Sequence, residues 1–354
     1  MTEHAPMLKL DEIVTILRDG DEEARAIGED IDNETLGGAT THSEISGVTD
    51  YKCKDDADCL KKIRAIVDKL GKPKDAGFSR EKPAAPKAEP KDLYGILPSE
   101  RAKPYDMREV IARLVDGSEY TEYKEGYGQS ILTCYARIDG WAVGIVANQR
   151  KVVKSKKGEM QFGGVIYSDS ADKATRFIAN CNQKNIPLVF LQDVTGFMVG
   201  SRSEHGGIIK DGAKLVNAVS NSVVPKFTVI VGNSYGAGNY AMCGRAFDPF
   251  LTLAWPGSKC SVMGAAQAAN VLLQIDLAAR ERKGEKIDEE MRKQLLAAIT
   301  ASYSEQQDIL YGAARGWLDR IIDPERTREE LIAALRMAAM VPCEADYRTG
   351  VLQT

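Results

Sequence analysis

Histidine is scarce in this sequence of 354 residues, which holds three: His4, His42 and His205. So few imidazoles exclude a histidine-rich metal site, and they leave a catalytic triad few places from which to take its base. No run of 18 uninterrupted apolar residues occurs, so we expect no membrane-spanning helix. Residues 1–10 lack a charged start followed by an apolar core, so we expect no secretory signal there.

Net positive charge and paired cysteines are lacking as well. The chain has 47 Lys and Arg residues against 51 Asp and Glu, which leaves no net basic field to hold nucleic acid. Its seven cysteines are odd in number and scattered, which favours reduced thiols in a cytoplasm or a similar compartment. Cys53 and Cys59 have no matching second pair, so we expect no zinc site and no other bound metal.

Glycine, by contrast, is abundant at 31 of the 354 residues. This residue lets the main chain turn tightly and lets a ligand approach it closely. The hydrophobic share of 44% is ordinary for a folded protein and excludes wholesale disorder. The length corresponds to about two domains, or to one large one.

Composition divides the N-terminal third of the chain into two parts. Residues 1–72 are predicted to form a small helical piece, because apolar residues recur at helical spacing over 8–17 and 60–70. Between these, residues 36–47 form a glycine-bounded turn with neither a helix nor a strand period. Residues 73–104 hold six of the 13 prolines and are predicted to be a linker that runs extended over a surface.

Residues 105–345 are predicted to form one α/β domain, followed by a tail at 346–354. Strand and helix patterns alternate here, which favours a mostly parallel sheet. Asp139-Gly140 separates two β-rich runs and predicts a hairpin. The predicted strands are 131–138, 141–147, 187–192, 226–231 and 250–254, and the predicted helices are 107–115, 171–183, 207–221, 239–244, 265–282, 288–302 and 328–340.

Two glycine-rich segments, 192–200 and 232–239, follow buried strands, and each leads toward a helix. In open α/β folds, ligands bind beyond the carboxyl ends of the strands. Gly236, Ala237 and Gly238 directly precede a predicted helix, where backbone N–H groups are unpaired and the helix dipole favours negative charge. Such preformed donors are what an oxyanion hole needs to hold an enolate or a similar anion.

Plainer interpretations of these segments stay open. Glycine loops after strands often serve only as turns. The spacing of Gly232, Gly236 and Gly238 is neither a dinucleotide fingerprint nor a phosphate-binding loop, because no Gly-Lys-Ser/Thr follows. His205 lies in a polar stretch and is predicted to be solvated rather than a catalytic base. Taken alone, the glycine loops therefore do not define a function.

Several blocks that occur together and in order are more specific than any single loop. They resemble the C-terminal half of the carboxyltransferase (beta) component of biotin-dependent acyl-CoA carboxylases, of the methylcrotonyl-CoA and propionyl-CoA type. The resemblance is dense over 105–345. Residues 28–72 resemble the end of that family's N-terminal half, and residues 1–27 do not resemble the family where a match is expected. The blocks are 162–166, 170–174, 195–200, 206–214, 234–245 and 255–270.

The resemblance implies a crotonase-like fold, a spiral of ββα units, and a reaction. A carboxyl group moves between N1-carboxybiotin and the α-carbon of an acyl-CoA. The oxyanion hole for the biotin ureido oxygen maps onto Gly236, Ala237 and Gly238, with a contribution from Gly196 and Phe197. The further residues that the block pattern places at biotin are Thr195, Gly206, Gly207 and Tyr235.

The implied chemistry agrees with the residues. Backbone N–H groups stabilise negative charge as it develops on the ureido oxygen when CO2 leaves, and on the enolate when the α-proton is removed. Biotin itself can take that proton, so neither a histidine nor a glutamate of the protein is required. The scarcity of histidine is therefore no objection to this function.

The resemblance also implies partners. The sequence has no biotin-attachment motif and no ATP-binding half, so biotin carboxyl carrier protein and biotin carboxylase must be other chains or domains. Family members pair head to tail, which implies a homo- or hetero-oligomer. The N-terminal half that supplies most of the acyl-CoA site, including its oxyanion hole, is represented only by its tail. That half is a separate chain, or the sequence is truncated, or the protein has another role; we favour a separate chain.

Two other functions stay open beside the carboxylase. A carboxyltransferase subunit of a sodium-coupled acyl-CoA decarboxylase would use the same site in reverse. A non-catalytic assembly subunit would keep the fold without the reaction. A crotonase-type hydratase is disfavoured, because no glutamate stands beside either glycine loop to activate water.

Overall fold

The computed structural model describes residues 31–69, 75–98, 100, 103–155, 158–283, 288–342, 345–350 and 352. The chain divides into two compact units, Met1–Lys72 and Pro73–Thr354. The helix expected over 8–17 lies outside the described residues. No helix in the described ranges has the length and apolar character needed to cross a membrane.

The first unit is helical, and its described helices form no hydrophobic core. It contains α3 (Asn33–Gly37), the π-helix η1 (Thr41–Ile45) and α4 (Asp56–Val67), and none of these has a buried residue. The helix predicted over 60–70 is confirmed by α4. The turn predicted over 36–47 is wrong, because α3 runs to Gly37 and η1 occupies most of the rest. The Asp32 carboxylate caps α3 by accepting the backbone N–H of Thr35 at 3.0 Å.

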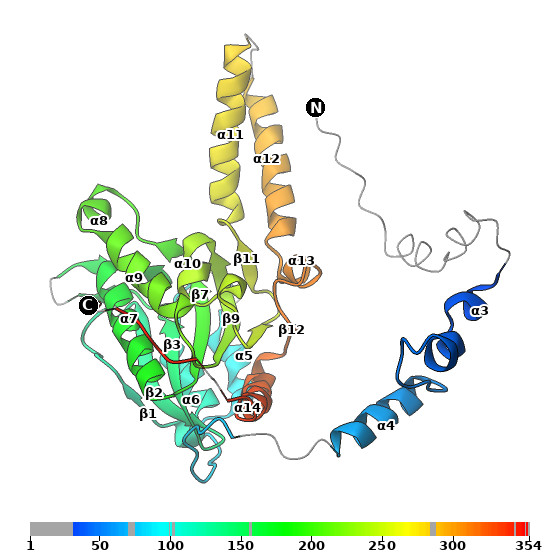
Figure 1. The fold of residues 1–354 in the computed structure, drawn as a ribbon. Coiled ribbons are helices and arrows are strands. Elements are labelled where there is room, and N and C mark those ends of the chain that lie inside the picture. The colour runs from blue at the N-terminus through cyan, green and yellow to red at the C-terminus, as the bar shows by residue number, and fades with distance from the viewer. Residues whose placement is uncertain are drawn as a thin grey trace. The chain divides into compact units, whose positions relative to one another are not determined.

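The second unit is built on one twisted sheet of eight strands (Figure 1). Its order is β1-β2-β3-β7-β9-β10-β12, and β11 pairs with the end of β9. β1, β2 and β3 are antiparallel, and the remaining pairs are parallel, which confirms the predicted mostly parallel sheet. The strands are β1 (Tyr120–Glu122), β2 (Ile131–Ile138), β3 (Trp141–Asn148), β7 (Leu188–Val194), β9 (Lys226–Tyr235), β10 (Leu251–Ala254), β11 (Lys259–Ser261) and β12 (Arg320–Ile321).

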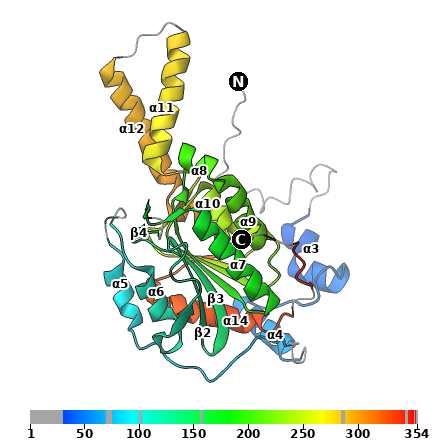
Figure 2. The same ribbon diagram turned by 90° about the vertical axis from the view of Figure 1, so that its left-hand side faces the viewer.

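Helices cover both faces of this sheet (Figures 1 and 2). Because side chains alternate along a strand, neighbours in β3 enter different cores. Ile145 packs with the face covered by α6 and α14, whereas Val146 packs with the face covered by α7, α9 and α10. These helices are α6 (Met107–Leu114), α7 (Ser168–Gln183), α9 (Ile208–Ser220), α10 (Gly236–Ala241) and α14 (Thr327–Ala338).

A helical hairpin projects from this domain (Figures 1 and 2). It consists of α11 (Ala265–Arg282) and α12 (Glu289–Gln306). The buried residues of α11 lie at its base and end at Leu273, and α12 has none. Beyond its base, the hairpin is therefore held by the contacts of its two helices with each other. α13 (Ile309–Ala313) returns the chain to the sheet.

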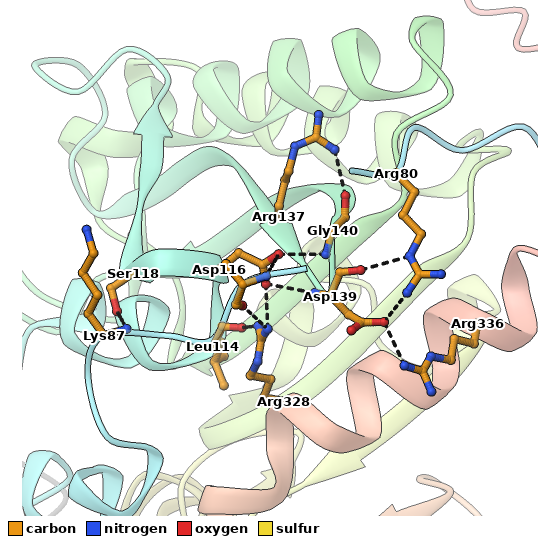
Figure 3. A network of polar contacts seen from close by, with 11 residues as sticks. Arg80, Lys87, Leu114, Asp116, Ser118, Arg137, Asp139, Gly140, Arg328 and Arg336 are labelled. Atoms are coloured by element: carbon orange, nitrogen blue, oxygen red, sulfur yellow. Dashed lines mark hydrogen bonds and ion pairs between the residues drawn. The ribbon is translucent and has the colours of Figure 1, made fainter. Parts of the chain in front are cut away.

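Residues 75–98, predicted as part of a linker, belong to the second unit and form a strap that is bonded to the rest of it; Figure 3 shows the contacts of Arg80 and Lys87 in this strap. Arg80 forms a β-bridge with Trp141, and its guanidinium is paired with Asp139 at 2.7 Å. The Arg328 guanidinium donates to the carbonyl of Ala84 at 2.9 Å and is paired with Asp116 at 2.6 Å. The prediction that this segment is extended is wrong for its last part. Pro90–Asp92 form a 3-10 turn and α5 (Leu93–Ile96) follows, with Leu93 fully buried.

The second glycine-rich segment is not a loop. β9 continues through Gly232 to Tyr235, and α10 begins at once at Gly236. The predicted loop over 232–238 is therefore wrong, and the helix predicted over 239–244 begins and ends three residues earlier, as α10. β11 runs parallel to this extension and pairs Cys260 with Ser234, which gives these residues strand partners from a distant part of the chain.

Candidate active site

The two glycine-rich segments meet at the carboxyl ends of β7 and β9. β7 is followed by β8 (Gly196–Phe197), which pairs with β6 (Val165–Ile166). A Cβ atom placed on Gly238 would lie 2.6 Å from Cγ2 of Val194 and 3.2 Å from Cα of Gly196. Only glycine at position 238 lets the first turn of α10 pack this closely on the first segment.

Backbone donors stand at this junction. Gly236, Ala237 and Gly238 form the first turn of α10, where N–H groups have no acceptor within the helix. Gly236 has a φ of +51°, which favours glycine, and turns the chain from strand to helix. Gly238 is buried, Gly236 is half-buried and Ala237 is exposed, so the turn is reached from solvent at Ala237. This arrangement can stabilise an oxyanion.

Phe197 is held beside these donors by α9. A Cβ atom on Gly212 of α9 would lie 2.8 Å from the Phe197 ring, so a glycine in mid-helix makes room for the aromatic side chain. Gly196 has a φ of +136°, which favours glycine and fixes the bend after β7. The structure thus brings together Gly196, Phe197 and Gly238.

Thr195 and Tyr235 lie in the same two segments, but their donors are already engaged. The N–H of Thr195 donates to the carbonyl of Gly164 at 2.8 Å, and its hydroxyl donates to the same oxygen at 3.1 Å. The buried Tyr235 hydroxyl donates to Oε1 of Gln307 at 3.1 Å. Both side chains therefore support the segments from within.

Gly206 and Gly207 lie at the junction of α8 (Ser201–His205) and α9. Their N–H groups donate to the carbonyls of Arg202 at 3.0 Å and Glu204 at 3.1 Å, so neither is a free main-chain donor. His205 is exposed, as expected of a solvated histidine.

A buried carboxylate that the sequence did not single out lies under both segments. Asp193, near the end of β7, accepts the Tyr105 hydroxyl at 2.8 Å and the backbone N–H of Asn233 at 2.8 Å. Nε of Arg150 lies 3.3 Å from the same carboxylate. The one signal in the sequence is an aspartate near the end of a mostly apolar strand, where an unpaired charge would be costly.

A pocket lies close to this junction but not at the backbone donors. This pocket of about 200 Å³ opens at the other end of α10, lined by residues that include Gln192, Tyr240 and Trp317, and the three backbone donors do not line it. Within the described residues, no group of three or more His, Cys, Asp and Glu side chains is placed to hold a metal ion.

The fold and the paired glycine segments define a class of protein. Residues 19–348 match the model of the carboxyl transferase domain, and the chain belongs to this family. The fold resembles that of the P. aeruginosa geranyl-CoA carboxylase beta subunit with a TM-score of 0.73 and 37% identity, covering 91% of this chain and 59% of that one. The predicted family and the crotonase-like fold class are confirmed. The prediction that residues 1–27 do not resemble the family is wrong for residues 19–27, because the family match begins at residue 19.

Two curated relatives indicate the range of named activities. The chain is 43% identical to the biotin-dependent 3-methylcrotonyl-coenzyme A carboxylase beta1 subunit of Mycobacterium tuberculosis, covering 90% of this chain and 58% of the relative. It is 39% identical to the methylmalonyl-CoA decarboxylase subunit alpha of Veillonella parvula, covering 88% of this chain and 57% of the relative. The chain thus spans less than three fifths of the length of both relatives.

Proposed function

We propose that this chain is the biotin-facing part of an acyl-CoA carboxyltransferase, which moves a carboxyl group between N1-carboxybiotin and the α-carbon of an acyl-CoA. One observation carries the proposal. The first turn of α10 presents backbone donors at an exposed position, packed through Gly238 onto the segment that holds Gly196 and Phe197. The carboxylase and decarboxylase names of the relatives fit this chemistry.

The residues present fit the oxygen of a ureido group, because backbone donors stand at a position that is open to solvent at Ala237. Biotin, when bound, supplies a ureido nitrogen that carries the carboxyl group and can accept the α-proton of the acyl-CoA. The N–H groups of Gly236, Ala237 and Gly238 would hold the ureido oxygen and would stabilise negative charge on it. They act as fixed dipoles that need little reorganisation during the reaction. The small side chain of Ala237 leaves the approach open.

The proposed partners follow from the family to which the chain belongs. A biotin carboxyl carrier protein and a biotin carboxylase would load and deliver the carboxyl group. A separate chain would supply the N-terminal carboxyltransferase half, with residues 31–69 as the end of that half, and the assembly would be a homo- or hetero-oligomer. The six cysteines of the described residues are free thiols, which fits a cytoplasm.

A second candidate is the carboxyltransferase subunit of an acyl-CoA decarboxylase. The identity to the Veillonella parvula decarboxylase subunit favours it. The same donors would act, because a transition state is stabilised equally in both directions. Carboxylation that depends on ATP in the isolated complex supports the carboxylase. Carboxyl loss from a malonyl-type acyl-CoA in a complex that holds a membrane subunit supports the decarboxylase.

A bulky side chain at position 237, the exposed donor of α10, tests the proposed function. Ala237→Leu should lower carboxyl transfer by the complex isolated from its native cells by about 100-fold, the effect of losing one oxyanion donor. Ala278→Leu, on the exposed part of α11, is the matched control and should leave transfer unchanged. Mass spectrometry of the complex should find a biotinylated protein and a chain that resembles the N-terminal half. Unchanged transfer in Ala237→Leu would contradict the catalytic role and favour an assembly subunit.

A further inference from the structure

The pairing of β7 with β9 has an irregular register near the candidate active site. Gln192 pairs with Ile230 and Val194 pairs with Ser234, so β7 advances by two residues while β9 advances by four. The two extra residues of β9 form a bulge, a feature that is common beside active sites and redirects a strand. β9 leads directly into Gly236, so the shape of this bulge sets where the backbone donors lie.

The Asp193 carboxylate holds this bulge. One oxygen accepts the N–H of Asn233, which lies within the bulge, at 2.8 Å. The other oxygen accepts the Tyr105 hydroxyl at 2.8 Å and lies 3.3 Å from Nε of Arg150. The side chain of Asp193 is 5% exposed, and its own N–H donates to Oδ1 of Asn148 at 3.2 Å. A side chain of β7 thus takes over a main-chain contact that the irregular register removes.

Gly232 shows how closely the carboxylate fits. A Cβ atom at this position would lie 2.3 Å from Cγ of Asp193, which no real contact allows. The Asp193 carboxylate therefore fills the space that a side chain at position 232 would need, and only glycine at this position allows the bulge to pack against it. Gly164, which accepts from Thr195, also lies close to the main chain of Asp193, because a Cβ atom there would lie 2.8 Å from its carbonyl oxygen.

We propose that Asp193 is a positioning residue, which fixes the donors of α10 relative to Gly196 and Phe197. The activity part of this inference rests on the proposed function, whereas the structural part does not. Asp193 stands three residues before Gly196 in the chain and holds Asn233, which stands three residues before Gly236. One carboxylate therefore ties the two segments at equal distance from the junction, and Tyr105 and Arg150 orient it.

Asp116 provides a matched control, since it is a carboxylate of similar burial in the same domain. It is paired with Arg328 at 2.6 Å and accepts the N–H of Gly140 at 2.7 Å, on the strap side of the domain (Figure 3). Neutralising Asp116 should loosen the strap and the β2–β3 hairpin. Neutralising Asp193 should loosen the two glycine segments.

The experiment compares Asp193→Asn, Tyr105→Phe and Asp116→Asn in the full chain within its native complex. Asparagine at 193 must turn an NH2 group toward either the N–H of Asn233 or Arg150, so one contact is lost. Hydrogen exchange in peptides covering 193–200 and 232–240 should rise about tenfold in Asp193→Asn, the change expected for loss of about 1.4 kcal/mol of local stability. Tyr105→Phe, which keeps the carboxylate, should give the same pattern with a smaller rise. Asp116→Asn should raise exchange around 79–88 and 139–142 instead.

Carboxyl transfer separates a positioning role from a merely structural one. Asp193→Asn should lower kcat about tenfold with an unchanged KM for the acyl-CoA, because the donors on the biotin side are displaced. Asp116→Asn should leave kcat unchanged. If exchange in the two glycine segments does not rise in either Asp193→Asn or Tyr105→Phe, the positioning role is overturned. If the unaltered complex transfers no carboxyl group, the proposed function fails, and the exchange pattern still decides the role of Asp193.

Discussion

At the scale of single residues, two buried charges of the second unit have opposite surroundings. Asp193 accepts hydrogen bonds from Tyr105 and Asn233 and forms an ion pair with Arg150. Lys173 of α7 is fully buried, and its Nζ has no hydrogen-bond partner among the described residues. Burial lowers the pKa of Lys173 from 10.5 to about 8, against the opposing effect of the Glu122 carboxylate. An unpaired ammonium group in a core lowers stability.

Lys173 should therefore give the stability of the protein a specific pH dependence. Its folded pKa of about 8 lies below its unfolded value of 10.5, so between these values the unfolded state binds more protons and stability rises with pH. Lys173→Met should raise the free energy of unfolding by about 1–3 kcal/mol at pH 7. The difference between the two proteins should shrink from pH 8 to pH 10.

Urea unfolding at pH 7, 8, 9 and 10 measures this difference. Burial also raises the pKa of Cys181 to about 12 and that of Cys243 to about 11, which lowers stability at high pH. Both cysteines remain in both proteins, so their effect cancels in the comparison. A difference that stays constant over this range would show that Lys173 is not the titrating group.

The residues of the site could be predicted from the sequence only in part. The sequence singles out Gly236, Ala237 and Gly238 because glycines where a strand turns into a helix carry a local signal, and the structure has these residues in the first turn of α10. Tyr105 and Asp193 are 88 residues apart, and no local pattern joins them. Tyr105 also follows directly on a segment whose prolines indicate a linker, so its buried hydroxyl contact depends on the fold.

At the scale of elements, most helices and strands follow from their periods, and the exceptions depend on partners that lie far away in the chain. α11 has the predicted bounds, and β2 has the predicted span. β9 was predicted to end at residue 231, because Gly232 has low strand propensity. It continues to Tyr235 because β11 pairs with it and because Gly232 makes room for Asp193. Tertiary contacts of this kind outweigh local propensity.

The projecting hairpin should be dispensable for folding. Replacing residues 274–298 by a short Gly-Ser linker removes the part of α11 beyond Leu273, where no residue is buried, and most of α12. The melting temperature should change by less than about 3 °C, because little apolar surface is exposed by the deletion. Differential scanning calorimetry of both proteins measures the change, and a loss of 10 °C or more would show that the hairpin is part of the core.

At the scale of the whole molecule, the two units differ in how they are stabilised. The second unit has two large cores, one on each face of its sheet. The described helices of the first unit bury no residue and leave Ile63 and Val67 of α4 50% and 59% exposed. A fold without a core contributes little free energy of unfolding.

A chain of residues 73–354 should therefore unfold as the full chain does. We expect one cooperative transition with the same melting temperature and the same calorimetric enthalpy within error. The full chain should add no second transition when the two are compared in the same buffer. A lower melting temperature in the shorter chain would show that the first unit stabilises the second.

The strap also decides how the domain responds to mechanical force. Tension applied through residues preceding 75 reaches the N–H of Ala76, which donates to the carbonyl of Ala339, and then the bridge of Arg80 with Trp141. Next come the contacts of Ala84 with Arg328, and the buried Leu93 lies beyond them. Each would have to rupture in turn before the load arrived at Tyr105. These contacts should therefore break one after another under tension and protect the sheet edge that holds the two glycine-rich segments from force applied on its N-terminal side.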